Sequence, residues 1–156
     1  MKKILLASLM ALVLSGCAVQ HTGNYVQPTA QGQLAPSMNP VVSASIDILE
    51  QKYPPAKSAL KLNVTNDALF APLMTALRQA GYAVYEIQPE LQFKTSTETE
   101  KPAVPDSAQT LKYVFDLLDR NLSLYQLTMT VDKTRIAGVF KLEHGQYKQV
   151  SPWTVF

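Results

Sequence analysis

The sequence contains few of the residues from which catalytic and metal-binding sites are usually built. Its 156 residues include one cysteine, two histidines and six glycines. The histidines, His21 and His144, do not form a pair at metal-ligand spacing, and no glycine-rich loop suited to a phosphate group is present. We therefore expect no catalytic residue, no metal, no cofactor and no enzyme activity.

The sequence also lacks a large excess of either positive or negative charge. The chain has 14 basic and 12 acidic residues, and two of the basic ones, Lys2 and Lys3, stand at its start. Proteins that bind nucleic acid usually display clustered lysine and arginine, whereas the longest cluster here, Lys57 to Lys61, contains two lysines. We therefore expect no direct contact with nucleic acid and no small-molecule substrate.

The sequence has one long apolar run, which lies near the start of the chain. It extends over 11 residues from Ile4 to Leu14 and is interrupted only by Ser8. This run is too short to cross a bilayer, but it suits the hydrophobic region of a secretory signal peptide. Because lysines precede it and small residues follow it, residues 1–16 are predicted to be a signal peptide.

The residues Leu14-Ser15-Gly16-Cys17 resemble the lipobox of bacterial lipoproteins. The resemblance implies cleavage between Gly16 and Cys17 and lipid attachment to Cys17. The alternative is an ordinary signal peptide with an incidental cysteine. Ala18 follows the cysteine where aspartate would favour the inner membrane. By resemblance to the sorting rule of Gram-negative lipoproteins, we expect the cell outer membrane, with the domain facing the periplasm.

Residues 17–39 are predicted to form a lipid-anchored flexible tether. The segment has several glutamines, glycines and prolines and few large apolar residues, so it cannot bury enough surface to offset its ordering entropy. Its 22 residues after the cysteine could reach about 70 Å when fully extended. Tyr25 and Val26 are exceptions that dock on the domain or on a partner. Residues 40–156 are predicted to be a single α+β periplasmic domain with a mobile loop at 88–109.

The start of this domain has the pattern of a helix. Asn39 is expected as its N-cap, Pro40 as its first residue, and Pro54-Pro55 as its end. Its apolar residues recur at helical spacing, so they share one face, which rests on the domain core or docks on a neighbouring subunit. These residues are Val42, Ile46, Leu49 and Tyr53.

A strand–helix–strand unit is predicted next. Leu60 to Val64 alternates as a strand with one buried face, and Tyr82 to Ile87 is rich in residues that favour strands. Between them, Asn66-Asp67 can cap a helix that ends at Gly81. Pro72 requires either a kink in this helix or a late start.

The last third of the chain is predicted to be a β-meander. Strands are expected at 111–118, 122–131, 134–142 and 147–150, with turns at 132–133 and 143–146. Trp153 is expected as a core plug or an interface anchor. Together these patterns predict an α+β fold with a small, mostly antiparallel sheet and its helices on one face.

The order of these features resembles the TrbH family of conjugal transfer lipoproteins. The resemblance is carried by the signal, by the helix end Leu77-Arg78-Gln79-Ala80-Gly81-Tyr82, by the strand Leu127 to Val131, and by Pro152-Trp153-Thr154. It implies a structural component of a type IV secretion apparatus for mating-pair formation, which carries plasmid DNA between cells. The implied partners are outer-membrane and periplasmic subunits of that conjugative transfer complex.

Two alternatives stay open. One is an envelope lipoprotein that helps to assemble another outer-membrane machine, such as a secretin or a pilus. The other is a periplasmic hydrolase with a Ser–His–Asp triad, which would have to use His144. Since His144 stands beside Gly145 in a predicted turn, an exposed turn histidine is the simpler interpretation.

Overall fold

The structure is a computed structural model that describes residues 23–27, 36–88 and 103–156. Its described part has two helices, α1 (Asn39–Lys52) and α2 (Phe70–Gln79), and a 3-10 turn at Pro55–Lys57. The strands are β1 (Tyr25–Val26), β2 (Ala59–Asn63), β3 (Ala83–Ile87), β4 (Gln109–Asp119), β5 (Leu124–Val131), β6 (Thr134–Glu143), β7 (Gln146–Gln149) and β8 (Thr154–Val155).

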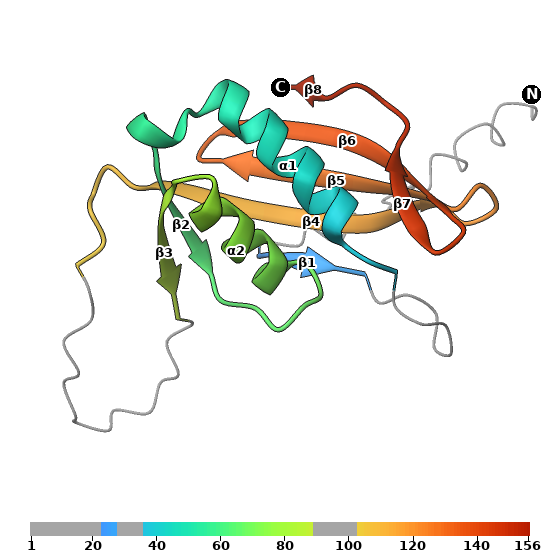
Figure 1. The fold of residues 1–156 in the computed structure, drawn as a ribbon, viewed down its shortest axis with the longest axis horizontal. Coiled ribbons are helices and arrows are strands. Elements are labelled where there is room, and N and C mark those ends of the chain that lie inside the picture. The colour runs from blue at the N-terminus through green and yellow to red at the C-terminus, as the bar shows by residue number, and fades with distance from the viewer. Residues whose placement is uncertain (1–22, 28–35, 89–102) are drawn as a thin grey trace, which may run out of the picture.

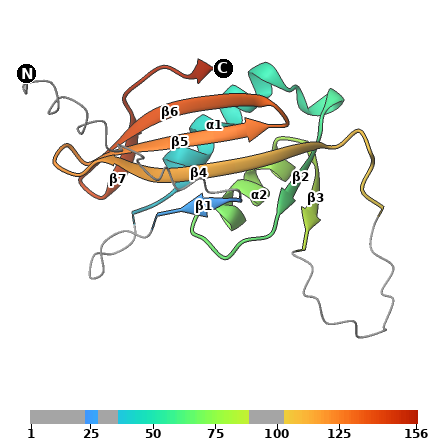
Figure 2. The same ribbon diagram turned by 180° about the vertical axis from the view of Figure 1, so that it is seen from behind.

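All eight of these strands belong to one sheet, whose main order is β3-β2-β4-β5-β6-β7. Strands β4 to β7 are an antiparallel meander, while β2 pairs in parallel with both β3 and β4. Both helices lie on one face of the sheet, as the opposite views in Figures 1 and 2 show. The predicted α+β class and mostly antiparallel sheet are confirmed, although the sheet is larger than expected.

Alternation along the strands separates two faces of this sheet. The face under the helices contributes most of the buried core, including Leu60, Leu111, Tyr113, Phe115 and Leu127. The opposite face, called here the open face, is not covered by either helix (Figure 2). By the strand registers and the alternation of side chains, the open face includes Lys61, Tyr85, Lys112, Val114, Asp116, Thr128, Thr130, Arg135, Lys141, Glu143 and Lys148.

Helix α1 begins and ends close to the predicted residues, and its predicted apolar stripe packs on the core. Its N-cap is Met38, and the N–H of Asn39 donates to Oγ of Ser37 at 3.3 Å, so the prediction of Asn39 as N-cap is wrong by one residue. Ile46 packs against the core but is only half-buried, because it lies on the side of α1 toward α2. The residues that α1 buries are Val41, Val42, Ser45, Ile48 and Leu49.

Helix α2 ends at Gly81 as the sequence predicts, whereas its N-cap is Leu69, two residues after the predicted cap at Asp67. At its start, Oδ1 of Asp67 accepts the N–H groups of Leu69 and Phe70, each at 2.9 Å. At its end, Gly81 adopts φ +91°, its N–H donates to Arg78, and the N–H of the next residue donates to the Leu77 carbonyl. This is a Schellman ending.

Pro72 is accommodated by the late start of α2. It is the third residue of the helix, so it lies within the first turn, where backbone N–H groups have no intrahelical acceptor. The missing N–H of proline therefore costs no helical hydrogen bond at this position.

The two predicted hairpin turns are present. Asp132 adopts φ +53° between paired Val131 and Thr134, and His144 and Gly145 adopt φ +51° and +77° between β6 and β7. Left-handed conformations at the turn residues match the twist of two-residue hairpins.

Strand β1 confirms the expectation that Tyr25 and Val26 dock on the domain, and it shortens the predicted tether. Tyr25 and Val26 pair in parallel with Val114 and Phe115 of β4, so residues 23–27 belong to the domain. This pairing is possible because β2 leaves β4 after Lys61 and exposes the rest of the edge of β4. Ser37 also bridges to β7, and Met38 is buried, whereas residues 17–22 and 28–35 lie outside the described part.

The predicted mobile loop at 88–109 is only partly described. Residues 89–102, most of the predicted mobile loop, lie outside the described residues. Its last part is described, and there Ala108 is buried and the strand starts at Gln109, two residues earlier than predicted. Within the described ranges, neither helix is long and apolar enough to cross a membrane.

Candidate interaction surface

An open groove of about 650 Å³ lies between α1 and α2. Its walls come from the outward sides of the two helices. The lining residues are Asn39, Val42, Ser43, Ile46 and Asp47 of α1, and Ala71, Pro72, Thr75, Ala76, Gln79 and Ala80 at α2. Both helices lie side by side on the same face of the sheet (Figure 1).

Small side chains open this groove. Ala76 and Ala80 face it from α2, and Ser43 faces it from α1, so the helices do not fill the space between them. Its inner parts are buried or half-buried apolar groups, such as Val42 and Ile46. Polar groups such as Asn39, Ser43 and Thr75 are exposed at its rim.

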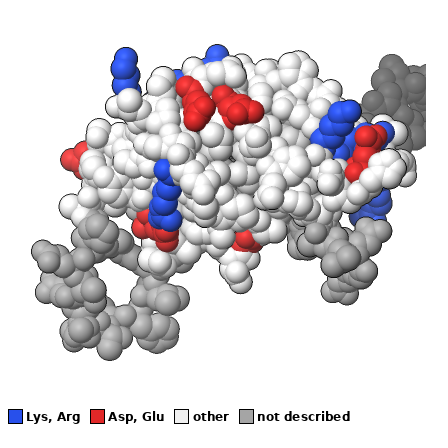
Figure 3. All heavy atoms as spheres, in the orientation of Figure 1, with Lys and Arg blue, Asp and Glu red and all other residues white. Residues whose placement is uncertain are grey.

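The groove is almost without charge. Asp47 is the single ionisable side chain among its lining residues. In the space-filling view, charged side chains gather in a few small groups and wide uncharged surface lies between these groups (Figure 3). An apolar floor with a polar rim, and little charge to desolvate, is the composition of a protein-binding surface and not of a site for acid–base chemistry.

A partly buried polar cluster supports the start of α2. The Asp67 carboxylate accepts hydrogen bonds from the hydroxyls of Thr65 and Tyr113, each at 2.7 Å, besides the two backbone N–H groups. Burial raises the pKa of Tyr113, the hydrogen bond with Thr65 opposes that rise, and Asp67 adds to it. The cluster ties α2 to β4, and every donor in it has an acceptor.

Sequence reasoning found only one member of this cluster. Asp67 was expected as a helix cap, whereas Tyr113 is 46 residues away on another strand. Nothing in the local pattern around Tyr113 distinguishes it from an ordinary core residue. The groove was also missed, and the sign that could have indicated it is the run of small residues on both predicted helices.

Trp153 packs on the core, as the first of its two predicted roles requires. Its ring lies 5.9 Å from that of Phe140, in an edge-to-face arrangement. Gly138 makes room for it, because a Cβ at that position would lie 2.8 Å from Cε3 of the indole. The Pro152-Trp153 segment therefore folds back over the helix side of β6 before β8 begins.

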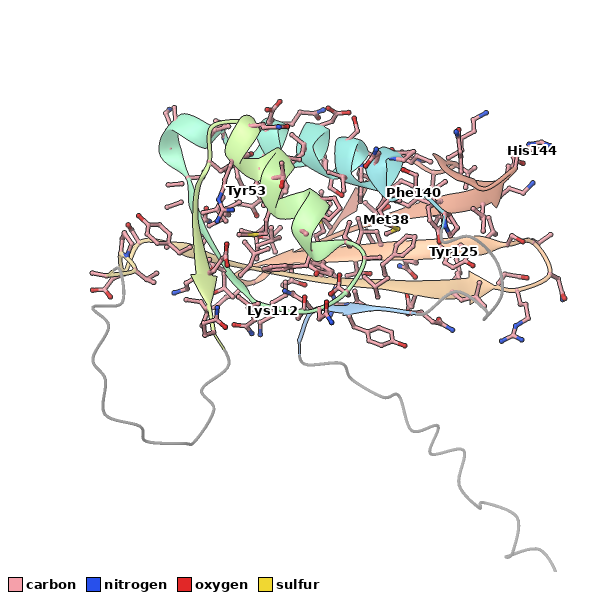
Figure 4. All side chains as sticks on the ribbon, turned by 60° about the horizontal axis from the view of Figure 1, so that its bottom comes forward. Met38, Tyr53, Lys112, Tyr125, Phe140 and His144 are labelled. Carbon is pink, nitrogen blue, oxygen red and sulfur yellow. The ribbon has the colours of Figure 1, made fainter. Side chains whose placement is uncertain are left out.

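The residues weighed for chemistry do not come together into a site. His144 is exposed in the β6–β7 turn, at the end of the molecule away from Tyr53 (Figure 4). Asp119 Oδ1 accepts the N–H of Leu122 and so shapes the β4–β5 turn. In the described ranges no group of three or more histidine, cysteine, aspartate or glutamate side chains is placed to hold a metal. Gly16, Cys17 and His21 lie outside the described residues, so their predicted roles stay predictions.

The described residues thus define a two-layer α+β domain with a surface suited to binding other proteins. The family model described as conjugal transfer protein TrbH matches residues 19–156. The chain therefore belongs to the TrbH family of conjugal transfer proteins, and the predicted resemblance is confirmed. The match includes residues 19–58, which carried none of the resemblance seen in the sequence. No curated protein and no solved structure matched this chain.

Proposed function

We propose that this protein is an outer-membrane lipoprotein that acts as a structural component of a conjugative type IV secretion apparatus. The observation that carries the proposal is the match to the conjugal transfer family over residues 19–156. That match favours conjugation over the alternative of a secretin or pilus assembly protein. The lipobox at Leu14 to Cys17 supports lipid attachment, and Ala18 supports sorting to the outer membrane.

In this proposal the acyl chains hold the protein at the membrane and the domain binds neighbouring subunits. Two or more acyl chains on one residue give stable anchoring, whereas a single chain gives only marginal binding. The groove between α1 and α2 receives apolar side chains of another subunit of the transfer apparatus. Its low charge supports this role, since burying it costs little desolvation of ions.

Deletion of the gene tests the conjugation role. Plasmid transfer frequency should fall when the gene is removed and should recover when it is supplied in trans. Transfer at the normal frequency without the gene would contradict the proposal.

Acyl labelling and fractionation test the anchor separately. The wild-type protein should incorporate labelled fatty acid and sediment with outer-membrane markers, while Cys17→Ser should accumulate as an unlabelled precursor. Recovery of the wild-type protein with inner-membrane markers would contradict the sorting role given to Ala18.

Charged substitutions test the groove. Ser43→Arg and Thr75→Arg place a cation at exposed positions of the rim, so they should lower transfer without unfolding the domain. Gln51→Arg is the matched control, because Gln51 is exposed on α1 but does not line the groove. Equal transfer by all three variants would remove the groove from the proposal.

A further inference from the structure

The chain between the lipid site and the domain is shorter than the sequence suggests. Residues 23–27 lie on the sheet, so the five residues 18–22 separate Cys17 from Gly23 at the start of the docked segment. The six steps from the Cα of Cys17 to the Cα of Gly23 span at most roughly 22 Å even when fully extended, compared with about 70 Å for the whole predicted tether. If Cys17 carries the lipid, as proposed above, the domain must lie next to the membrane surface.

The docking of this segment is specific. Asn24 Nδ2 donates to the carbonyl of Asn63 at 2.9 Å, and its Oδ1 accepts the N–H of Tyr113 at 3.0 Å. Gln27 Oε1 accepts the N–H of Leu117 at 2.8 Å, and the N–H of Gln27 donates to Phe115. The two side chains complete the hydrogen bonding of β4 at both ends of β1, so the point of entry into the domain is fixed.

The first described residues belong to an edge strand, since β1 pairs along the free part of the edge of β4. Lys112, an open-face residue, lies beside the start of β1 in the view from below (Figure 4). Tyr25 pairs with Val114 and shares its face, whereas Val26 packs on the core. The short link from the lipid site therefore ends at this edge of the sheet, which borders the open face.

The open face has the charge that a phospholipid surface attracts. Its strands carry five basic side chains and three acidic ones, namely Lys61, Lys112, Arg135, Lys141 and Lys148 against Asp116, Asp119 and Glu143. Glu143 is paired with Lys141 at 2.8 Å, which holds the pKa of that carboxyl below its ordinary value. By contrast, α1 and α2 carry two basic and two acidic residues, namely Lys52, Arg78, Asp47 and Glu50.

Tyrosines border the basic residues. Tyr25 and Tyr85 belong to the open face by register and are half-buried. Tyrosine has an apolar ring and a polar tip, which suits it to the boundary between headgroups and water. Lysine and arginine near an anionic lipid surface are attracted to its phosphates.

We infer that the open face of the sheet lies against the phospholipid headgroups, with Lys61, Lys112 and Arg135 at their phosphates. This inference rests on the proposed lipid attachment at Cys17. It gives the domain a fixed orientation in which the α1–α2 groove is turned away from the membrane toward other periplasmic subunits. The short link and the basic face then act together, since the link holds the face within reach of the lipid.

Distance measurements on the acylated protein test this orientation. Because Cys17 is the single cysteine of the chain and is acylated in this proposal, one added cysteine gives one reactive thiol. A fluorophore on Thr128→Cys reports on the open face, and the same fluorophore on Ser43→Cys reports on the rim of the groove. Each protein is placed in vesicles of phosphatidylcholine and phosphatidylglycerol in equal parts, with an energy acceptor on the headgroups.

Energy transfer should be several-fold stronger from Thr128→Cys than from Ser43→Cys. The sheet and the helix layer lie between the two positions, so residue 43 is farther from the membrane than residue 128 by roughly 20 Å. Equal transfer from both positions, or stronger transfer from Ser43→Cys, would overturn the inference.

Charge variants test the contact itself. Lys112→Gln with Arg135→Gln should lower transfer from the Thr128→Cys label and abolish its dependence on phosphatidylglycerol. The matched control, Lys52→Gln with Lys57→Gln, removes two exposed cations away from the open face and should leave transfer unchanged. An identical response of the two pairs would overturn the assignment of the open face.

Flotation and fatty-acid content distinguish this inference from the function on which it rests. If the protein carries no acyl chains, the short link no longer holds the domain at the membrane. Both the proposed lipid anchor and the inferred orientation are then wrong. A protein that is acylated and floats with the vesicles, but gives equal transfer from both labels, would overturn the orientation alone.

Discussion

The two faces of the sheet are built from alternate residues of the same strands but have different roles. On β4, Tyr113 and Phe115 are buried under the helices, while Lys112 is exposed on the open face and Val114 is half-buried there. The covered face gains its free energy from apolar and aromatic burial. The open face contributes little to folding, so its residues are free to serve binding. Substitutions that change one face at a time can test this difference.

The largest effect is expected at the centre of the covered face. Phe115 is 1% exposed and its ring lies 5.1 Å from Tyr147 and 5.5 Å from Tyr125. Phe115→Ala should therefore lower the free energy of unfolding by about 3–5 kcal/mol, as measured by urea denaturation. Val114→Ala is the control on the open face and should cost about 1 kcal/mol or less. Equal losses would show that the two faces do not differ in this way.

A smaller effect is expected where β6 meets Trp153. Gly138→Ala places a Cβ within 2.8 Å of the indole, so the ring must move, at a cost of about 1–3 kcal/mol. The same substitution should be nearly neutral in a Trp153→Ala background, because the obstacle is gone. A double-mutant cycle by urea denaturation measures this coupling, and additive effects would rule out the contact as the cause.

Loss of a hydrogen bond in the polar cluster at the start of α2 should lower the free energy of unfolding by at most about 3 kcal/mol, since Tyr113 donates to the Asp67 carboxylate. Tyr113→Phe removes that donor while keeping the ring. Tyr85→Phe is the matched control on the open face and should stay within about 0.5 kcal/mol of wild type. Thermal unfolding of the two variants provides the measurement, and a Tyr85 effect as large as that of Tyr113 would contradict the proposed division.

The smallest effect concerns Tyr82 at alkaline pH. Burial, together with the negative charge of Glu50, raises the pKa of Tyr82 from 10.0 to about 12. Its hydroxyl donates to the Tyr53 carbonyl at 2.8 Å, so the neutral phenol is the form that the fold favours. A raised folded-state pKa gives stability that is present below pH 10 and lost as the pH rises toward 12.

Wild type should therefore lose stability more steeply than Tyr82→Phe as the pH rises above 10. Urea midpoints collected at several alkaline pH values would show the two curves converging. Parallel curves would mean that the pKa of Tyr82 does not differ between the folded and unfolded states.

Local signals predicted much of this fold because the relevant interactions are local. The cap at Asp67, the stop at Gly81 and the turn at Asp132 each use neighbouring residues, and alternation along β5 gave its buried face. Strand β1 could not be predicted in the same way. It has two residues, and its docking depends on Asn24 and Gln27 bonding to β4 about 90 residues further along the chain.

The candidate surfaces were less predictable than the fold. The groove depends on how α1 and α2 lie beside each other. The predicted stripe placed Ile46 against the core correctly but did not indicate that Ile46 also lines the groove. The basic character of the open face is hidden in the sequence, because its lysines and arginine are separated along the chain and meet only when the strands pair. For the lipid site the reverse holds. The local motif at Leu14 to Cys17 predicts it from the sequence, but it lies outside the described residues.

Complementation of plasmid transfer tests the central claim most directly. A donor that lacks the gene receives either the wild-type gene or Cys17→Ser, and transfer frequency is measured for both. We predict that wild type restores transfer and that Cys17→Ser does not, although the variant is produced. Full restoration by Cys17→Ser would contradict the account of a lipid-anchored component of the conjugative apparatus.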